Sequence, residues 1–271
     1  MEMREGPPVN LQFGNWTCNI DGVFSMISVD LSLFRTLPRK DLPQLVRLTT
    51  AFLRPTSRGL PDSSEWDHIL RIEDAFGQAF RNRHSAVFAG HIYGGGGYEG
   101  YFYVPKYDGM PQTMDEVAAS LPPDFPAYDL QMATRKDSEW TVYRQLLYPN
   151  PMGMQSILTT QVIKSLQSQG DDLLESRPVH HQALFQTKEQ VSQFIGRVLQ
   201  ERFTVDSEQK NDKSGDGYPF SVWISRVDSV QPQQIDYTVS GVFLHTVESG
   251  GKYNGWVTKA HSPQQGPSQG S

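Results

Sequence analysis

Apolar and polar residues alternate along the chain in blocks that favour strands, separated by blocks with helical spacing. Two β-rich runs, 15–20 and 23–33, flank Asp21-Gly22, a pair that favours a tight hairpin turn. The same patterns predict further strands at 45–52, 85–93, 98–104, 128–134 and 140–147, and helices at 62–83 and 113–121. We therefore expect the first half to mix strands with helices.

The second half follows Tyr148-Pro149-Asn150-Pro151, where two prolines bracket a turn-forming asparagine. We place a domain boundary there, which gives domains at 1–150 and 151–260. The remaining residues, 261–271, are almost all Ser, Pro, Gln and Gly, a composition that cannot bury enough apolar surface to order itself. We expect this tail to be disordered.

In the second domain, a helix at 154–166 is predicted to end at Gly170. The patterns then predict strands at 179–186, 203–205, 220–227 and 252–259, and helices at 191–199 and 232–247. Without the extra elements, both halves have the order β-α-β-β-α-β, which is typical of a ferredoxin-like fold. The predicted class is α+β: two tandem ferredoxin-like domains, with an extra N-terminal hairpin and an added helix before the second.

Three helix starts are predicted by capping boxes, in which an N-cap side chain is followed three residues later by Glu or Gln. These pairs are Asp62 with Glu65, Thr113 with Glu116, and Thr187 with Gln190.

Charge and cysteine content narrow the classes of function. Neither half is basic, with 14 basic and 18 acidic residues in 1–150 and 10 and 12 in 151–271, which disfavours a nucleic-acid partner. Cys18 is the single cysteine, which rules out an internal disulfide and favours a reducing compartment. The sequence shows neither an apolar run of about 18 residues nor an export signal. We expect a cytoplasmic protein without a membrane partner.

A glycine-rich motif at residues 95–100 has the spacing G-x-G-x-x-G of nucleotide-binding loops. A phosphate site needs this motif to open a helix, whereas here an aromatic strand follows. A hairpin is therefore strongly favoured over a cofactor site.

The adjacent His180 and His181 are candidates for metal ligands, but neighbouring strand residues point to opposite faces. We expect His181 to be a hydrogen-bonded core residue and His180 to be more exposed. None of the seven histidines lies in a nucleophile or metal motif, and Asp171-Asp172 favours a solvated turn over an acid pair. We predict no catalytic residue, no metal site and no cofactor.

Trp223 alternates with the apolar residues of its strand and so lies on the opposite face. An aromatic residue on an open ferredoxin-like face can stack on RNA bases. Without basic residues around it, packing against a protein or the other domain is favoured.

Several motifs of the second domain are those of a known family. The run Val162 to Leu166, the turn Gly170 to Leu173 and the pattern Arg177-Pro178-Val179-x-His181 resemble the opening of the RraB family. The residues Tyr253, Gly255, Trp256 and Thr258 resemble that family's closing Y-D-G-W-G-T segment, with Asn254 in place of Asp and Val257 in place of Gly. The resemblance covers about residues 154–259.

The first domain resembles the family of domain-of-unknown-function 695, which often precedes an RraB-like domain. The residues that carry this resemblance are Trp16, Val29-Asp30-Leu31, Ile72-Glu73-Asp74 and Tyr101-Phe102-Tyr103.

The resemblance to RraB implies a bacterial, non-catalytic regulator that binds ribonuclease E and inhibits it by protein contact, without a cofactor. The best-known family members are strongly acidic. This domain has 10 basic and 12 acidic residues, so another ribonuclease or a different protein remains an alternative partner. RNA binding, toxin neutralisation by an immunity-type protein and enzymatic activity also remain open. The sequence indicates neither the role of the first domain nor the oligomeric state.

The candidate partner-binding residues are Asp171, Asp172, Trp223, Tyr253 and Trp256. Tyr253 and Trp256 are equally compatible with a place in the core, because they flank Gly255 in a predicted strand.

Overall fold

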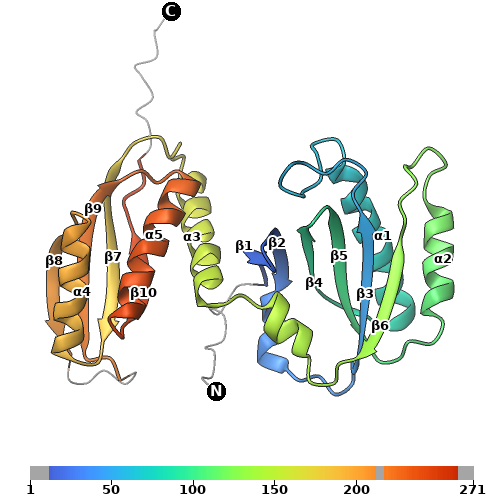
Figure 1. Ribbon diagram of the computed structural model, residues 1–271, viewed down its shortest axis with the longest axis horizontal. Helices are drawn as coiled ribbons and strands as arrows, with labels where there is room; N and C mark the ends of the chain where they lie inside the picture. Colours follow the sequence, from blue (N-terminus) through green and yellow to red (C-terminus); the bar gives the residue numbers. More distant parts are fainter. Residues whose placement is uncertain (1–11, 212–216, 262–271) are drawn as a thin grey trace, which may run out of the picture. The chain divides into compact units, whose positions relative to one another are not determined.

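The structure, a computed structural model, describes residues 12–211 and 217–261. The chain divides between Asn150 and Pro151 into two compact units, each built of an antiparallel sheet and helices (Figure 1). The predicted α+β class is therefore confirmed. Apart from His261, the tail expected to be disordered lies outside the described residues.

The N-terminal unit contains a six-stranded antiparallel sheet with the order β1-β2-β4-β5-β3-β6. Its strands are β1 Phe13–Ile20, β2 Val23–Asp30, β3 Gln44–Ala51, β4 Val87–Gly94, β5 Gly97–Val104 and β6 Gln131–Lys136. The predicted hairpin at Asp21-Gly22 is confirmed, and both turn residues have positive φ. The glycine-rich motif forms the β4–β5 hairpin, as predicted. The N-terminal hairpin, formed by β1 and β2, extends the sheet beyond β4.

Two helices, α1 Trp66–His84 and α2 Met110–Ser120, contribute to a core on one face of this sheet. Ile69, Ile72, Phe76 and Phe80 of α1 recur at helical spacing and are fully buried against β3 and β5. The 3₁₀ helix η1 Leu31–Thr36 follows β2.

The segment predicted as a strand at 140–147 is instead a helical turn containing the π-helical η2, Tyr143–Leu147, so this prediction is wrong. The Asp137 carboxylate explains the difference, because it accepts hydrogen bonds from the N–H groups of Thr141, at 2.8 Å, and Val142, at 3.0 Å. It also accepts the Tyr103 hydroxyl at 2.7 Å. Trp140 then stacks on the Tyr103 ring with centroids 3.6 Å apart.

Only one of the three predicted capping boxes forms. At the start of α4, Lys188–Gln200, Thr187 and Gln190 cap one another's backbone N–H groups. The Glu65 carboxylate does not cap a helix. It points to the segment after β3 and accepts hydrogen bonds from the backbone N–H groups of Leu53, at 2.6 Å, and Arg54, at 3.0 Å. The helix consequently begins at Trp66, later than predicted.

The third predicted capping box, Thr113 with Glu116, is also wrong. The helix begins earlier, at Met110 after the positive-φ Gly109. The Thr113 hydroxyl is hydrogen-bonded to His84, and Glu116 forms an ion pair with Arg83. Both side chains therefore join α2 to the end of α1.

The C-terminal unit has a four-stranded antiparallel sheet with the order β10-β7-β9-β8. Its strands are β7 Arg177–Phe185, β8 Thr204–Lys210, β9 Phe220–Asp228 and β10 Lys252–Val257. Both edge strands are irregular. A register shift lies between Val205 and Ser207 in β8, and another between Tyr253 and Gly255 in β10.

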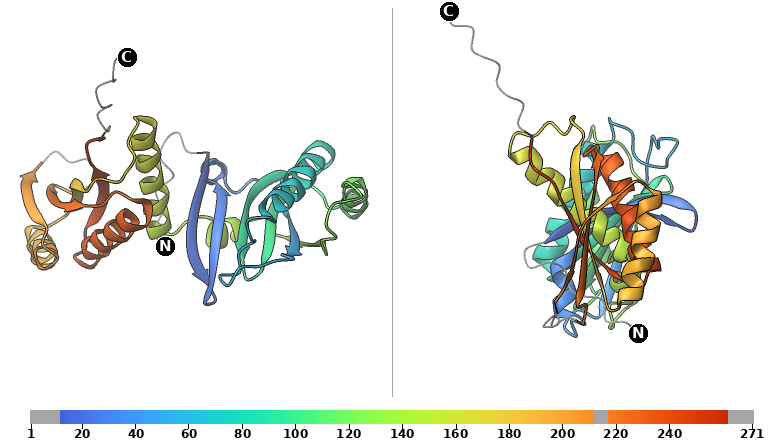
Figure 2. Two further views of the ribbon diagram at one scale, coloured as in Figure 1. Left: turned by 90° about the horizontal axis from the view of Figure 1, so that it is seen from above. Right: turned by 90° about the vertical axis from the view of Figure 1, so that its left-hand side faces the viewer.

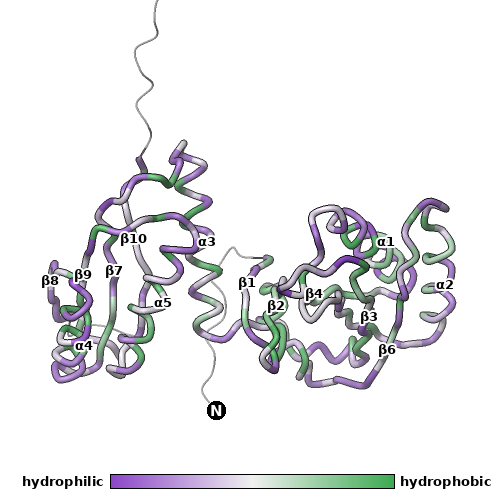
Figure 3. Tube along the Cα trace, turned by 45° about the horizontal axis from the view of Figure 1, so that its top comes forward, coloured by the Kyte–Doolittle hydropathy of each residue, from purple (hydrophilic) through white to green (hydrophobic). Residues whose placement is uncertain are grey.

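The helices of this unit are α3 Pro151–Ser168, α4 Lys188–Gln200 and α5 Pro232–Glu248. The last two lie on the same side of the sheet (Figure 2), and alternate residues of β7 and β9 enter the core beneath them. The hydropathy along these elements can be followed in Figure 3. α3 packs against α5 and β10. Within the described residues, none of the helices combines the length and apolar character needed to cross a bilayer.

Candidate functional site

The irregular strand β10 determines where its two aromatic residues lie. Tyr253 is opposite Ala183 and Gly255 is opposite Gln182, so Asn254 is an extra residue in the strand. In a regular strand, positions 253 and 256 would face opposite sides of the sheet. The bulge instead allows Tyr253 and Trp256 to join the same core, with 5% and 6% of their surfaces exposed.

Trp256 also joins β10 to α3. Its indole Nε1–H donates to the Thr159 hydroxyl at 3.2 Å, and Thr159 is itself buried. A second bond, from the Ser156 hydroxyl to the Asp236 carboxylate at 2.8 Å, joins α3 to α5. These contacts fix α3 beside the edge of the sheet.

A groove of about 420 Å³ lies between α3 and the sheet face opposite α4 and α5. Its apolar walls are Leu158, Val162, Trp223, Trp256 and Val257. Its rim carries four amide side chains, Gln155, Gln161, Gln182 and Asn254. None of these residues is charged. The groove therefore suits a neutral segment that can place an apolar side chain against the indoles and form hydrogen bonds with the amides.

The amides on the sheet are held in a row across three strands. Asn254 Nδ2 donates to Gln182 Oε1 at 2.7 Å, and Gln182 Nε2 donates to the Ser221 hydroxyl at 2.8 Å. Trp223 lies opposite Gln182 in the β7–β9 register and is half-buried. The row holds the Gln182 and Asn254 side chains in place at the rim and leaves Trp223 partly accessible.

The structure brings only Trp223 and Trp256 together in this groove. Asp171 is in the interior, where its carboxylate binds the Arg177 guanidinium at 2.6 Å and accepts backbone N–H groups of Leu173 and His261, each at 2.9 Å. Burial opposes ionisation of this carboxyl, but the His261, Leu173 and Arg177 donors outweigh it and lower its pKa. Asp172 is exposed and accepts the Leu174 N–H at 3.1 Å.

His181 is a hydrogen-bonded core residue, as predicted. It is fully buried, and its Nδ1 lies 2.7 Å from the Tyr253 hydroxyl. Burial, with smaller contributions from Arg226 and His180, lowers the pKa of His181 to about 3. The ring is therefore neutral at physiological pH.

His180 lies on the opposite face from His181 and is more exposed, as predicted. Its Nδ1 lies 2.8 Å from Asp206, and the other oxygen of that carboxylate accepts the Ser225 hydroxyl at 2.7 Å. In a nucleophilic triad the serine would bond to the histidine, so these three residues lack that geometry. Across 12–211 and 217–261, no group of three His, Cys, Asp or Glu side chains is placed to hold a metal ion.

Cys18 is a partly exposed free thiol on β1. Burial raises its pKa, so the thiol stays protonated at neutral pH. It therefore lacks the lowered pKa of a catalytic cysteine.

Sequence reasoning missed the amide rim and the α3 wall of the groove. Gln155, Gln161 and Gln182 belong to no motif, and glutamine is common on exposed helices. The one sequence signal that pointed to the amide rim was Asn254, which precedes Gly255 in the segment that resembles the end of the RraB family. Its role depends on the bulge, which the residue pattern does not indicate.

Two family models match the chain. The model described as a family of unknown function, DUF695, matches residues 12–148. The model described as regulator of ribonuclease activity B, RraB, matches residues 156–258. No curated protein matches. A crystal structure of an unknown protein from Galdieria sulphuraria is similar, with 12% sequence identity, a TM-score of 0.22, and coverage of 80% of this chain and 99% of that chain.

Proposed function

Because the chain belongs to the DUF695 family over residues 12–148 and to the regulator of ribonuclease activity B family over 156–258, we propose that it is a non-catalytic regulator that modulates a ribonuclease by protein contact. We propose ribonuclease E, or another ribonuclease of the same cell, as the partner. The single cysteine, typical of a reducing compartment, supports a cytoplasmic location.

We also infer that both units are ferredoxin-like. The C-terminal unit has the element order β7-α4-β8-β9-α5-β10, and its first and third strands are central in the sheet. The N-terminal unit repeats this arrangement with β3-α1-β4-β5-α2-β6 and the sheet order β4-β5-β3-β6. This fold leaves the sheet face opposite the helices open to a partner.

The groove beside Trp223 is the observation that carries the proposal. It combines a partly accessible indole with apolar walls and an amide rim, the composition of an interface centre. Near Trp223, the open face carries Gln182, Ser221 and Asp206, and the described residues there form no cluster of basic side chains. This supports a protein partner over an RNA strand, which requires cationic contacts to phosphate.

Replacing Trp223 with alanine is expected to weaken binding to the ribonuclease about thirtyfold, the loss typical of an aromatic hot spot. Biolayer interferometry with immobilised ribonuclease measures this affinity, and cleavage of a fluorescent RNA measures inhibition. The matched control is Tyr237→Ala, which removes an 83% exposed aromatic ring from α5 in the same unit. This control should bind as the wild type does.

Equal binding by Trp223→Ala and wild type would contradict the groove as the contact site. Absence of both binding and inhibition with ribonuclease E and the other ribonucleases of the host would reject the proposed function. If inhibition instead arises from binding the RNA substrate, the chain will bind single-stranded RNA with an affinity that falls steeply with salt.

A further inference from the structure

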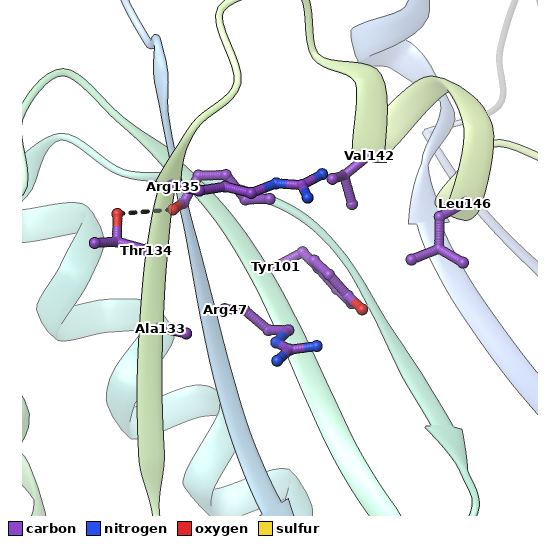
Figure 4. Close-up of a pocket in the computed structure, with 8 residues that line it drawn as sticks. Arg47, Tyr101, Ala133, Thr134, Arg135, Val142 and Leu146 are labelled. Carbon is purple, nitrogen blue, oxygen red and sulfur yellow. Dashed lines mark hydrogen bonds between the residues drawn. The ribbon is translucent and has the colours of Figure 1, made fainter.

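A second pocket, of about 250 Å³, lies in the N-terminal unit on the sheet face opposite α1. Its floor is formed by β3, β5 and β6, and its far wall by Val142 and Leu146 of the turn that replaced the predicted strand. Figure 4 shows Arg47 and Arg135 on either side of the Tyr101 ring. The pocket thus has two guanidinium groups above an otherwise largely apolar lining.

The positive charge in this pocket is only partly neutralised. Arg47 Nη1 lies 3.4 Å from Glu99 Oε2, a long ion pair, and the same oxygen accepts the Tyr101 hydroxyl at 2.5 Å. Arg135 makes no ion pair with any carboxylate of the described residues. A second carboxylate, that of Asp137, lies behind the Val142 wall, where it accepts the N–H groups of Thr141 and Val142 and the Tyr103 hydroxyl. Neither carboxylate forms a close ion pair with Arg135, so its guanidinium group can bind a ligand anion.

The hydroxyl groups at the pocket do not add negative charge. Burial, together with the Glu99 hydrogen bond, raises the pKa of Tyr101, so its hydroxyl remains a neutral donor. The Thr134 hydroxyl donates to the Leu45 carbonyl at 2.9 Å, which occupies its proton. The donors left for a ligand are therefore those of the two arginines.

We propose that this pocket binds a small organic anion whose carboxylate or phosphate head contacts Arg47 and Arg135 and whose apolar body lies against Leu45, Val142 and Leu146. Guanidinium groups bind planar carboxylate and phosphate oxygens through paired, charge-assisted hydrogen bonds. The volume lies just below the usual range for small-molecule sites, about 300–1,000 Å³, so the body is about the size of one aromatic ring. The site is separate from the Trp223 groove and does not depend on a ribonuclease partner.

The test is calorimetric titration of the full chain at low salt with phenyl phosphate, benzoate, inorganic phosphate and phenol. Phenyl phosphate, benzoate or both are expected to bind, and the tighter of the two identifies the head group. Inorganic phosphate should bind more weakly because it lacks an apolar body, and phenol should not bind because it lacks the anion. Arg135→Gln should weaken anion binding at least about tenfold, as expected for a lost charge-assisted contact.

The matched control is Arg71→Gln, which removes one positive charge from the exposed surface of α1 in the same unit. It should bind the anions as the wild type does, and its far-ultraviolet circular dichroism should match that of Arg135→Gln. Arg47→Gln is expected to weaken binding as well. Failure of both organic anions to bind, or equal weakening by Arg71→Gln and Arg135→Gln, would overturn the proposal.

Discussion

Replacing Asp171 with asparagine is expected to lower the free energy of unfolding by about 3 kcal/mol. The variant keeps the shape of the side chain but removes its charge, which leaves the Arg177 side chain, only 9% exposed, without its counter-ion in the interior. The expected loss of unfolding free energy is at the lower end of the range for a broken buried ion pair, because Arg177 retains some contact with water. Urea unfolding monitored by circular dichroism measures the change.

Asp172→Asn provides a matched control one residue away. Its carboxylate is exposed and contacts the Leu174 backbone at 3.1 Å, so the expected change is within about 0.5 kcal/mol. The double variant Asp171→Asn, Arg177→Met should recover part of the loss by removing the stranded charge. Equal effects of the two asparagine variants would show that water screens the Asp171–Arg177 pair.

Acidification from pH 7 to pH 5 is expected to cost the wild-type chain about 2 kcal/mol of stability through His181. The pKa of this residue is about 3 in the folded protein, against 6.5 for an unperturbed histidine side chain. Below pH 6.5 the unfolded chain therefore takes up a proton that the folded chain does not. The contribution of His181 to the free energy of unfolding is fully present above pH 6.5 and is lost as the pH falls towards 3.

Urea unfolding at pH 7 and pH 5 tests this linkage. His181→Phe should lose about 2 kcal/mol less than the wild type over this interval, although its stability at pH 7 is lower because the Tyr253 hydroxyl loses its partner. His180→Gln, on the exposed side of the same strand, should retain the His181 contribution. An NMR titration gives an independent reading: a His181 ring proton that titrates near pH 6.5 would contradict the buried, neutral state.

Local sequence signals predicted the fold well where no distant residue competes with them. The turns at Asp21-Gly22 and Gly95-Gly96 require positive φ, which their residues supply directly. The capping box of Thr187 and Gln190 also formed, because the exposed Thr187 and the half-buried Gln190 both have their own helix end as partner.

The same kind of signal failed where a side chain found a partner elsewhere in the fold. Glu65 is 3% exposed and binds the backbone after β3, together with the Tyr128 hydroxyl at 3.0 Å, 63 residues away. Asp137 similarly changed an apparent strand into a turn. Capping boxes describe only local competition for backbone donors, so they do not predict these outcomes.

The candidate site was predicted only in part. The alternation in β9 correctly placed Trp223 on the face opposite the core, because that strand is regular there. The groove around it also needs the bulge at Asn254 and the position of α3, both of which depend on tertiary packing. The sequence pattern predicts that Asp171 and Asp172 form one solvated turn. In the structure the Asp171 carboxylate is buried, because it forms an ion pair with Arg177, six residues later.

The irregular edge of the C-terminal sheet also limits how another chain can approach. β8 has its register shift beside Asp206 and carries Glu208 and Lys210, so a visiting strand would meet a kinked backbone and exposed charges. Recruitment by β-augmentation is consequently disfavoured on that side. A binding partner that uses this sheet must be recognised by its side chains, and even a point substitution in its bound segment could abolish recognition.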